Sequence, residues 1–438
     1  MRSWDAERIA AAAGARVVRD GGAAGGEGPT RAVIDSRHVG PGDLFVGLVG
    51  EHVDGGRFAT DVLAAGAWGV LVGEAHGEAA AAAAGDGAVL VAADPLRALQ
   101  DLATAWRRAL GAKVIGITGS TGKTSTKDLT AAMVGQQRRV VATPLNLNTE
   151  IGLPLTVLGA PADTEVLVLE MAMRGAGQIA ELARIAEPDV GVIVNVGPVH
   201  LELLGTIEKI AATKSELIEG LRPGGTAIVP ADEPLLQTHL EHLPEGVATV
   251  TFGSGGDVSE LPEGLELPFT SAHMRSNALA ALAAARAVGV EPSGTLEVAL
   301  SELRGQRRTL PGGVVVIDDC YNANPMSMRA ALDDLAASAS GRRVAVLGDM
   351  LELGPDEVRF HEEIGTHARG AGVDLLVTVG PLAAAMGPAF GGETVAVDAA
   401  AEVASALKPR LRDGDTLLVK ASRGVGLEVV AQQLGAER

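Results

Sequence analysis

The feature that most constrains the fold is a repeated alternation of short, apolar, β-branched segments with longer stretches of helical periodicity. Most of these segments are apolar on both faces, as parallel strands buried between helices are. Strands that alternate with helices predict an α/β architecture with mostly parallel sheets. We expect strands at 31–34, 43–46, 69–72, 113–118, 165–170, 189–195, 226–229, 314–317, 344–347, 374–379 and 416–419.

The chain has 438 residues, which is too long for one ordinary domain. Turn signals and changes in composition predict a small first domain over 1–97, a central domain over 98–309 and a third domain over 310–438. The third domain begins at a Leu-Pro-Gly-Gly turn that precedes a strong strand. The segment 251–268 is rich in Gly, Glu and Pro and is expected to be a loop or a reduced excursion.

Composition excludes several classes of function. With 36 basic and 55 acidic residues the net charge is −19, which disfavours nucleic acid and anionic membrane surfaces as partners. The single cysteine, Cys320, excludes a disulfide framework and a cysteine-based zinc site. No stretch approaches the roughly 20 apolar residues of a membrane span, and no signal segment is evident at the N-terminus. We therefore expect a cytoplasmic protein without membrane insertion.

A glycine-rich loop follows the predicted strand 113–118 and precedes a helical stretch. Glycines in such a loop let backbone N–H groups face phosphate oxygens, the lysine offsets β- and γ-phosphate charge, and the threonine hydroxyl can hold Mg²⁺. The loop is a shortened variant, because Ile117 stands where the full motif has glycine. A glycine turn with a surface lysine is the alternative, but the strand–loop–helix context favours ATP or GTP. The loop residues are Gly119, Ser120, Thr121, Gly122, Lys123, Thr124 and Ser125.

Three further side chains could serve a metal or a phosphate. Glu170 ends a buried strand, where open α/β sheets bind ligands, and could hold Mg²⁺; it could equally be a solvated acid. His200 follows the next strand, but a lone histidine is often structural. Lys214 falls within the apolar stripe of the predicted helix 206–220. An inward lysine is costly unless it is paired or modified, or unless its ammonium reaches water.

Taken together, these motifs resemble the Mur ligase family, the ATP-dependent amide ligases of peptidoglycan precursor synthesis. The resemblance covers essentially the whole chain and is carried by segments 118–126, 144–154, 170–171, 195–200 and 212–216. It implies an N-terminal α/β UDP-binding domain, a central P-loop ATPase and a C-terminal Rossmann-like domain. It also implies that Lys123 serves ATP and that two Mg²⁺ ions are bound. Lys214 would carry a carbamate, and the implied metal ligands are Thr124, Glu170, His200 and Lys214.

Segments at the two ends resemble the members that join D-alanyl-D-alanine to UDP-N-acetylmuramoyl-tripeptide through an acyl-phosphate, giving ADP and phosphate. The most specific are 318–327 and 346–354, and segments 35–55 and 420–424 agree with them. The resemblance implies that Asn277, Arg307 and Asp319 contribute to ATP binding. The implied substrate-binding residues are Ser36, Arg37, Asn146, Asn148, Thr149, Tyr321, Asn324, Lys420, Ser422 and Arg423.

The sequence also departs from the family pattern. Met274 replaces an asparagine three positions before Asn277, and segment 253–269 looks short, which predicts a trimmed strand pair. Two alternatives stay open: another Mur or folylpolyglutamate-type amide ligase, or a non-catalytic nucleotide-binding subunit. The second is disfavoured because a binding subunit has no need of the implied second-metal residues. We expect a monomer.

Overall fold

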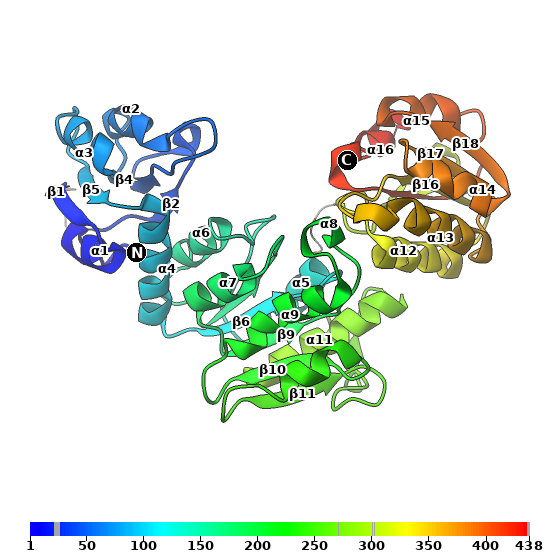
Figure 1. Cartoon of the computed structure of the whole chain (residues 1–438), viewed down its shortest axis with the longest axis horizontal. Coiled ribbons are helices and arrows are strands. Elements are labelled where there is room, and N and C mark those ends of the chain that lie inside the picture. The colour runs from blue at the N-terminus through cyan, green and yellow to red at the C-terminus, as the bar shows by residue number, and fades with distance from the viewer. Residues whose placement is uncertain (22–26, 270, 300, 302, 436–438) are drawn as a thin grey trace.

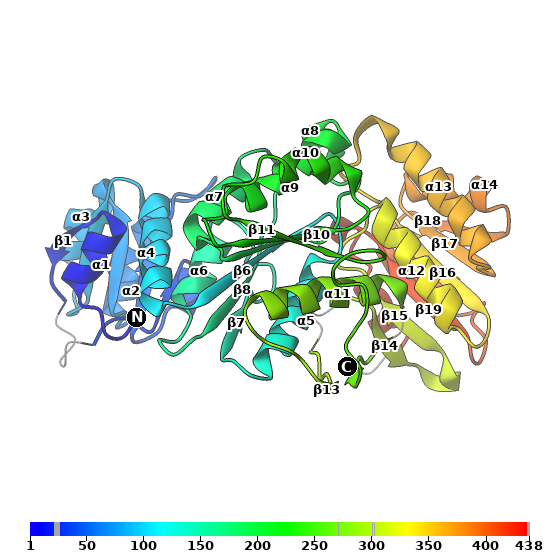
Figure 2. The same ribbon diagram turned by 90° about the horizontal axis from the view of Figure 1, so that it is seen from below.

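The computed structural model describes residues 1–21, 27–269, 271–299, 301 and 303–435. Three sheets, each with helices packed on it, follow one another along the chain (Figures 1 and 2). We call the parts built on them the N-terminal, middle and C-terminal units. The predicted α/β fold with mostly parallel sheets is confirmed.

The N-terminal unit is built on a sheet of strand order β1-β5-β4-β3-β2, in which only the β1–β5 pair is antiparallel. The sequence patterns did not predict β1 or β5. Strand β5 follows an alanine-rich helix, so the start of its apolar run cannot be distinguished from the sequence alone. Its elements are α1 (Ala6–Ala13), β1 (Arg16–Arg19), β2 (Arg31–Val33), β3 (Asp43–Val46), α2 (Ala59–Ala64), β4 (Gly69–Gly73), α3 (Glu74–Ala81) and β5 (Ala88–Ala92).

A long helix, α4 (Pro95–Leu110), leads into the middle unit, whose sheet is entirely parallel in the order β11-β10-β9-β6-β8-β7. Its strands are β6 (Lys113–Thr118), β7 (Val140–Ala142), β8 (Val166–Glu170), β9 (Val190–Ile193), β10 (Thr226–Pro230) and β11 (Ala248–Phe252). Its helices are α5 (Lys123–Gly135), α6 (Gly152–Leu158), α7 (Gln178–Ala186), α8 (Leu201–Leu204), α9 (Ile207–Glu219), α10 (Gln237–Leu240) and α11 (Ala272–Ala287).

The segment expected to be a trimmed excursion contains little regular structure. It holds one half of a pair of two-residue strands, β12 (Leu265–Glu266) and β13 (Gly294–Thr295). The remainder of 253–269 is turn and irregular chain, and Leu265 of β12 belongs to the same apolar cluster as residues of α11. The central sheet, which carries the phosphate loop, is therefore complete without this excursion.

The C-terminal unit has a sheet of order β14-β15-β19-β16-β17-β18, and only β14 runs antiparallel. Strand β14 lies before the boundary expected at 309/310, but it pairs with β15, which lies after that boundary. The exact domain boundaries stay predictions. The strands are β14 (Gln306–Thr309), β15 (Val315–Asp318), β16 (Arg343–Gly348), β17 (Leu375–Val379), β18 (Glu393–Val397) and β19 (Thr416–Lys420). The helices are α12 (Pro325–Ser338), α13 (Glu357–Gly370), α14 (Met386–Phe390), α15 (Ala400–Leu407) and α16 (Val429–Gln433).

The N-terminal and middle units share one continuous apolar core. That core runs from Met1 and Trp4 through α4 to Leu153 and Leu236, and Trp4 meets Trp106 edge-to-face at 5.3 Å. The buried apolar clusters of the C-terminal unit are separate from it in the part of the chain described here. The first two units are thus joined by one apolar core, whereas the third meets the middle unit outside that core, for example where the Met326 side chain lies against Gly197. Within the described ranges, no helix is long and apolar enough to cross a membrane.

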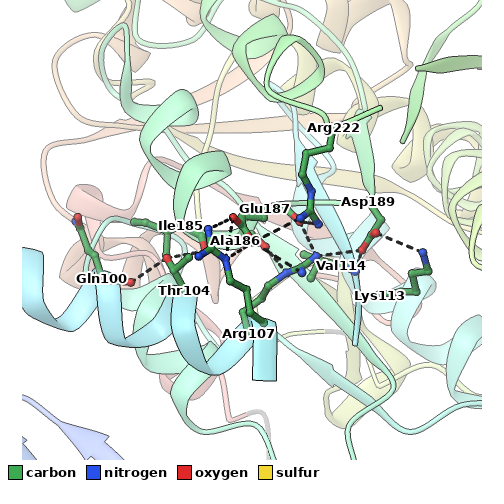
Figure 3. Close-up of polar contacts among 11 residues, drawn as sticks. Gln100, Thr104, Arg107, Lys113, Val114, Ile185, Ala186, Glu187, Asp189 and Arg222 are labelled. Atoms are coloured by element: carbon green, nitrogen blue, oxygen red, sulfur yellow. Dashed lines mark hydrogen bonds and ion pairs between the residues drawn. The ribbon is translucent and has the colours of Figure 1, made fainter. Parts of the chain in front are cut away.

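The C-terminal turn of α4 is also locked to the middle unit by a buried arginine (Figure 3). The Arg107 guanidinium donates to the carbonyl oxygens of Ala186 at 3.0 Å and Glu187 at 2.7 Å, and to Asp189 at 3.3 Å. These carbonyls end α7, where a helix lacks internal donors and a cation is favourable. Burial lowers the pKa of Arg107, and the Asp189 carboxylate opposes that shift.

We expect Arg107→Ala to lower the free energy of unfolding by about 3 kcal/mol, because it leaves two helix-end carbonyls and a carboxylate without their buried donor. The exposed pair between Arg97 and Asp101 on the same helix provides the control. Arg97→Ala should cost less than about 1 kcal/mol. Urea unfolding of the two variants measures the difference, and equal losses would contradict a structural role for the clamp.

Candidate active site

The phosphate loop lies between β6 and α5, at the carboxyl edge of the middle sheet. Gly122 sits at φ 75°, and a Cβ there would lie 2.5 Å from Oδ1 of Asn277. Glycine is therefore required both by the left-handed backbone and by the close approach of α11. The buried Asn277 lies directly against the loop, and its amide also contacts Met274 Sδ at 3.8 Å. The predicted nucleotide residue is thus next to the predicted loop.

Asn195, which follows β9, fixes the shape of the loop. Its Oδ1 accepts hydrogen bonds from the backbone N–H of Ser120 at 3.1 Å and of Thr121 at 2.9 Å. Its Nδ2 donates to Thr121 Oγ1 at 3.0 Å. The Ser120 hydroxyl in turn exchanges two hydrogen bonds with the backbone of Gly197. The loop is thereby held in shape by the segment that leads to His200.

Lys123 begins α5 and its Nζ donates to the carbonyl of Gly119 at 2.7 Å. Its ammonium therefore stays over the loop. Burial is the main cause that lowers the pKa of Lys123; the Arg304 charge adds to it and Glu170 opposes it. Glu170, at the end of β8, and Arg304, just before β14, are both close enough to Lys123 to act on its charge.

Glu170 ends β8 beside the loop and is 3% exposed. Its Oε1 accepts a hydrogen bond from Asn148 Nδ2 at 2.8 Å. Its Oε2 is buried and has no hydrogen-bond partner among the described residues. A buried carboxylate oxygen without a partner is costly, and a cation is the ligand that would satisfy it. The observation fits the Mg²⁺ expected here and disfavours the solvated-acid alternative.

Lys214 is only 1% exposed, in the middle of α9. Within the ranges that the structure describes, its amine has neither a hydrogen bond nor an ion pair. Burial, followed by the nearby Lys123 charge, lowers the pKa of Lys214 well below its usual value. The side chain lies inside the protein, and burial disfavours the charged form of its amine. A buried lysine beside a second lysine is unfavourable unless its charge is offset or removed.

His200 stands between the middle and C-terminal units. Its Nδ1 lies 2.5 Å from Oε2 of Glu352, which belongs to the loop after β16. Burial lowers the pKa of His200, and the Lys123 and Lys214 charges act in the same direction, whereas Glu352 raises it. His200, Lys123 and Lys214 are therefore close enough to affect one another electrostatically. Sequence reasoning missed Glu352, although it used the surrounding segment 346–354 as a family marker.

The described residues contain no group of three or more His, Cys, Asp or Glu side chains that could hold a metal by themselves. A divalent ion here would need additional oxygen ligands. Thr124, Glu170 and a modified Lys214 supply oxygen, His200 supplies nitrogen, and nucleotide phosphates supply the rest. The donor set fits a magnesium nucleotide rather than a free metal ion.

The predicted residues of the C-terminal unit hold its own loops together. Lys420 is 2% exposed and donates to Asp319 Oδ2 at 2.6 Å and to the carbonyl of Asn322 at 3.0 Å. Ser422 Oγ accepts from Leu351 N–H at 3.0 Å and donates to the carbonyl of Ala323. These side chains position the loops around 319–324 and 349–352, and their roles toward substrate stay predictions.

Other predicted residues have equally clear local roles. Asn324 forms a capping box with Ser327 at the start of α12, and Arg307 pairs with Asp334 at 2.9 Å. Tyr321 lies under two arginines, with Arg304 at 4.1 Å and Arg423 at 5.2 Å from its ring centre, as cation–π contacts. Their roles toward ATP or substrate stay predictions.

The remaining substrate candidates lie in the N-terminal unit and in the loop before α6. The exposed Arg37 pairs with Asp35 at 2.7 Å, next to Ser36 in a short 3-10 turn. In the loop, the backbone N–H of Asn148 donates to the carbonyl of Asn146. Thr149 Oγ1 accepts a weak hydrogen bond from Gly152 N–H at 3.4 Å. Of these, the structure brings only Asn148 into contact with Glu170.

Comparisons with known proteins identify the family to which the chain belongs. Family models for the Mur ligase middle domain, the Mur ligase glutamate ligase domain and the Mur ligase family catalytic domain match residues 117–285, 303–423 and 31–107. The UDP-N-acetylmuramoyl-tripeptide–D-alanyl-D-alanine ligase of Synechocystis is 40% identical, with 92% of this chain and 91% of that protein covered. This chain belongs to the Mur ligase family.

Two solved Mur ligase structures share the whole architecture. MurF from Acinetobacter baumannii has a TM-score of 0.86 and 30% identity, with 98% of each chain covered. MurF ligase from Thermotoga maritima, solved in complex with ADP, has a TM-score of 0.78 and 30% identity, with 92% of this chain and 96% of that chain covered. The likeness extends over all three units rather than over the nucleotide-binding part alone.

We expect Asn195→Ala to weaken ADP binding about tenfold, because it removes the acceptor that orders two loop N–H groups. Isothermal titration calorimetry with ADP measures the change. Gln237→Ala, an exposed amide substitution on α10, should leave the affinity within twofold of the unmodified protein. An unchanged affinity in the Asn195 variant would show that the loop keeps its shape without this side chain.

Proposed function

We propose that this Mur ligase joins D-alanyl-D-alanine to UDP-N-acetylmuramoyl-tripeptide with ATP, producing ADP and phosphate in peptidoglycan precursor synthesis. One observation carries the proposal. Lys123, Glu170, His200 and Lys214 gather around the phosphate loop, in a chain 40% identical to a curated ligase of that name over 92% of its length. The ADP complex of the Thermotoga relative supports the use of ATP.

The chemistry follows from the poor reactivity of a carboxylate toward amines. ATP transfers its γ-phosphoryl group to the terminal carboxylate of the tripeptide, which gives an acyl-phosphate and ADP. The free amine of D-alanyl-D-alanine attacks the acyl carbon, phosphate leaves through a tetrahedral intermediate, and the amine proton passes to solvent or phosphate. No side-chain nucleophile is needed. The work of the protein is to position anionic groups and to offset their repulsion.

The residues around the loop divide this work. The backbone N–H groups between Gly119 and Thr124 and the start of α5 bind phosphate oxygens. Lys123 neutralises charge as the γ-phosphoryl group moves. Thr124, Glu170, His200 and a modified Lys214 would hold one or two Mg²⁺ ions. When bound, Mg²⁺ supplies a fixed positive charge that favours phosphoryl transfer.

Lys214 would act as a carbamate. A neutral amine adds CO₂ and loses one proton, which gives an N-carboxylate with oxygen donors. The lowered pKa of Lys214 shifts the balance toward the neutral amine that carbamate formation needs, and burial disfavours the charged, unmodified side chain. The added negative charge would also offset the adjacent Lys123 ammonium.

The two organic substrates would be held by the flanking units. Ser36 and Arg37 are candidates for the UDP portion, and Asn146, Asn148 and Thr149 for the chain that leads to the reacting carboxylate. Candidates in the C-terminal unit are Tyr321, Asn324, Lys420, Ser422 and Arg423, with Asn277, Arg307 and Asp319 for the nucleotide. A monomeric state and a cytoplasmic location stay predictions.

Phosphate release assayed with a panel of acceptors tests the proposed function. We expect ADP and phosphate only when UDP-N-acetylmuramoyl-tripeptide, D-alanyl-D-alanine, ATP and Mg²⁺ are all present. Turnover with L-amino acids or glutamate instead of the dipeptide would favour another Mur or a folylpolyglutamate-type ligase. Absence of turnover with every acceptor, while ADP still binds, would favour a non-catalytic nucleotide-binding subunit.

We expect Lys214→Ala to lower kcat at least 100-fold and a small carboxylate such as acetate to restore part of it, because the carboxylate can replace the carbamate oxygens. Lys209→Ala removes an exposed lysine from the same helix and should keep full activity. Phosphate release with and without acetate measures both effects. If acetate restores nothing while ATP binding is normal, the carbamate assignment is wrong.

A further inference from the structure

An acidic side chain of the C-terminal unit lies against the loop that carries His200. Glu352 lies in the loop between β16 and α13, and His200 lies in the loop before α8, which is next to the C-terminal unit in both views (Figures 1 and 2). Oε2 of Glu352 is 2.5 Å from Nδ1 of His200. The backbone N–H of Glu202 also donates to the Glu352 carbonyl, and a Cβ on Gly354 would lie 3.4 Å from Glu202 Cα. The two loops are therefore in close contact.

His200 and Glu352 both adopt a left-handed backbone conformation, which residues other than glycine rarely adopt. His200 has φ 52° and Glu352 has φ 62°. Each such residue costs about 1 kcal/mol, so the surrounding structure must hold it in place. This strain occurs on both sides of one contact between units, and it aims the imidazole and the carboxylate at each other. The contact is therefore part of the folded architecture and is not an incidental pairing of surface charges.

Each loop is also anchored deep in its own unit. On one side, Gly197 is bonded to the hydroxyl of Ser120 in the phosphate loop. On the other, Leu351 N–H donates to Ser422 Oγ, and Ala383 N–H donates to Asp349 Oδ1 at 2.7 Å. An unbroken series of hydrogen bonds and short backbone links thus runs from the phosphate loop through His200 and Glu352 to the segment that follows β19.

The carboxylate determines which ring nitrogen of His200 is available. A carboxylate accepts but does not donate hydrogen bonds, so Nδ1 must carry the proton that points at Glu352. In the neutral ring Nε2 then has a free lone pair, which is the form that can bind a metal or accept a hydrogen bond. Carboxylates that orient a ligating histidine in this way strongly affect metal affinity in other proteins.

We propose that Glu352 is a positioning residue: it holds His200 with Nε2 free toward the phosphate-loop site, and it does so only while the C-terminal unit is seated on the middle unit. The inference rests on the proposed function, since it concerns the nucleotide site of the ligase. The apolar core shared by the first two units does not extend into the third. Whether Glu352 can contact His200 therefore depends on where the third unit lies relative to the middle unit. Without the Glu352 carboxylate, the orientation of His200 no longer depends on the position of the C-terminal unit.

The first readout needs no metal. With ¹⁵N-labelled histidine at pH 8, the His200 signal, assigned by its loss in His200→Asn, should show the Nδ1–H tautomer in the unmodified protein. Glu352→Ala should shift that signal toward the Nε2–H tautomer. Glu352→Gln keeps an oxygen acceptor and should retain Nδ1–H. The exposed Glu362→Gln, on α13 of the same unit, should change nothing.

The second readout is Mn²⁺ binding in the presence of a non-hydrolysable ATP analogue, followed by electron paramagnetic resonance. Glu352→Ala should weaken Mn²⁺ binding about tenfold, and Glu352→Gln and Glu362→Gln less than threefold. Circular dichroism of each variant controls for folding. An unchanged tautomer together with unchanged Mn²⁺ affinity in folded Glu352→Ala would overturn the proposal. The acceptor panel with the unmodified protein tests the proposed function separately.

Discussion

The carboxyl ends of neighbouring parallel strands must meet at one edge of a sheet, and the site depends on this constraint. Strand β6 leads into the phosphate loop, β8 ends in Glu170 on one side of it, and β9 leads to Asn195 and His200 on the other. Adjacent strands are only about 4.8 Å apart, so groups distant in the sequence share a small volume. The fold thus brings the anion-binding backbone, a carboxylate and an imidazole together before any ligand binds.

The same crowding creates an electrostatic cost that shapes the site. Two lysines, the partly buried Lys123 and the buried Lys214, lie near each other, and each has its pKa lowered, mainly by burial. Glu170 favours the charged form of Lys123 but has one buried oxygen without a partner. Such an arrangement is unfavourable by itself and would become balanced if phosphates, a divalent ion and the proposed carbamate added their charges. The charges of these side chains therefore suit a site that binds anionic phosphates together with a cation.

Much of this could be predicted from the sequence because the signals are local. A strand, a glycine loop and a helix read directly from residues 113–135, and the inward position of Lys214 followed from its place in an apolar helical stripe. The patterns failed where the deciding contact is distant. Nothing near Glu352 indicates a partner 152 residues away, and Lys420 looks like an exposed basic group until its pairing with Asp319 is seen.

The contrast between the two junctions indicates how the three units can work together. Burial of Trp4, Trp106 and their neighbours joins the N-terminal and middle units, and hydrophobic burial of that extent resists separation. The junction with the C-terminal unit includes the Glu352–His200 pair, which is partly exposed and exchangeable with water. Breaking a contact of this kind costs less than separating a buried apolar core, so the position of the C-terminal unit is easier to change than that of the N-terminal unit. Because the same contact orients a site histidine, closing the unit and completing the site become a single event.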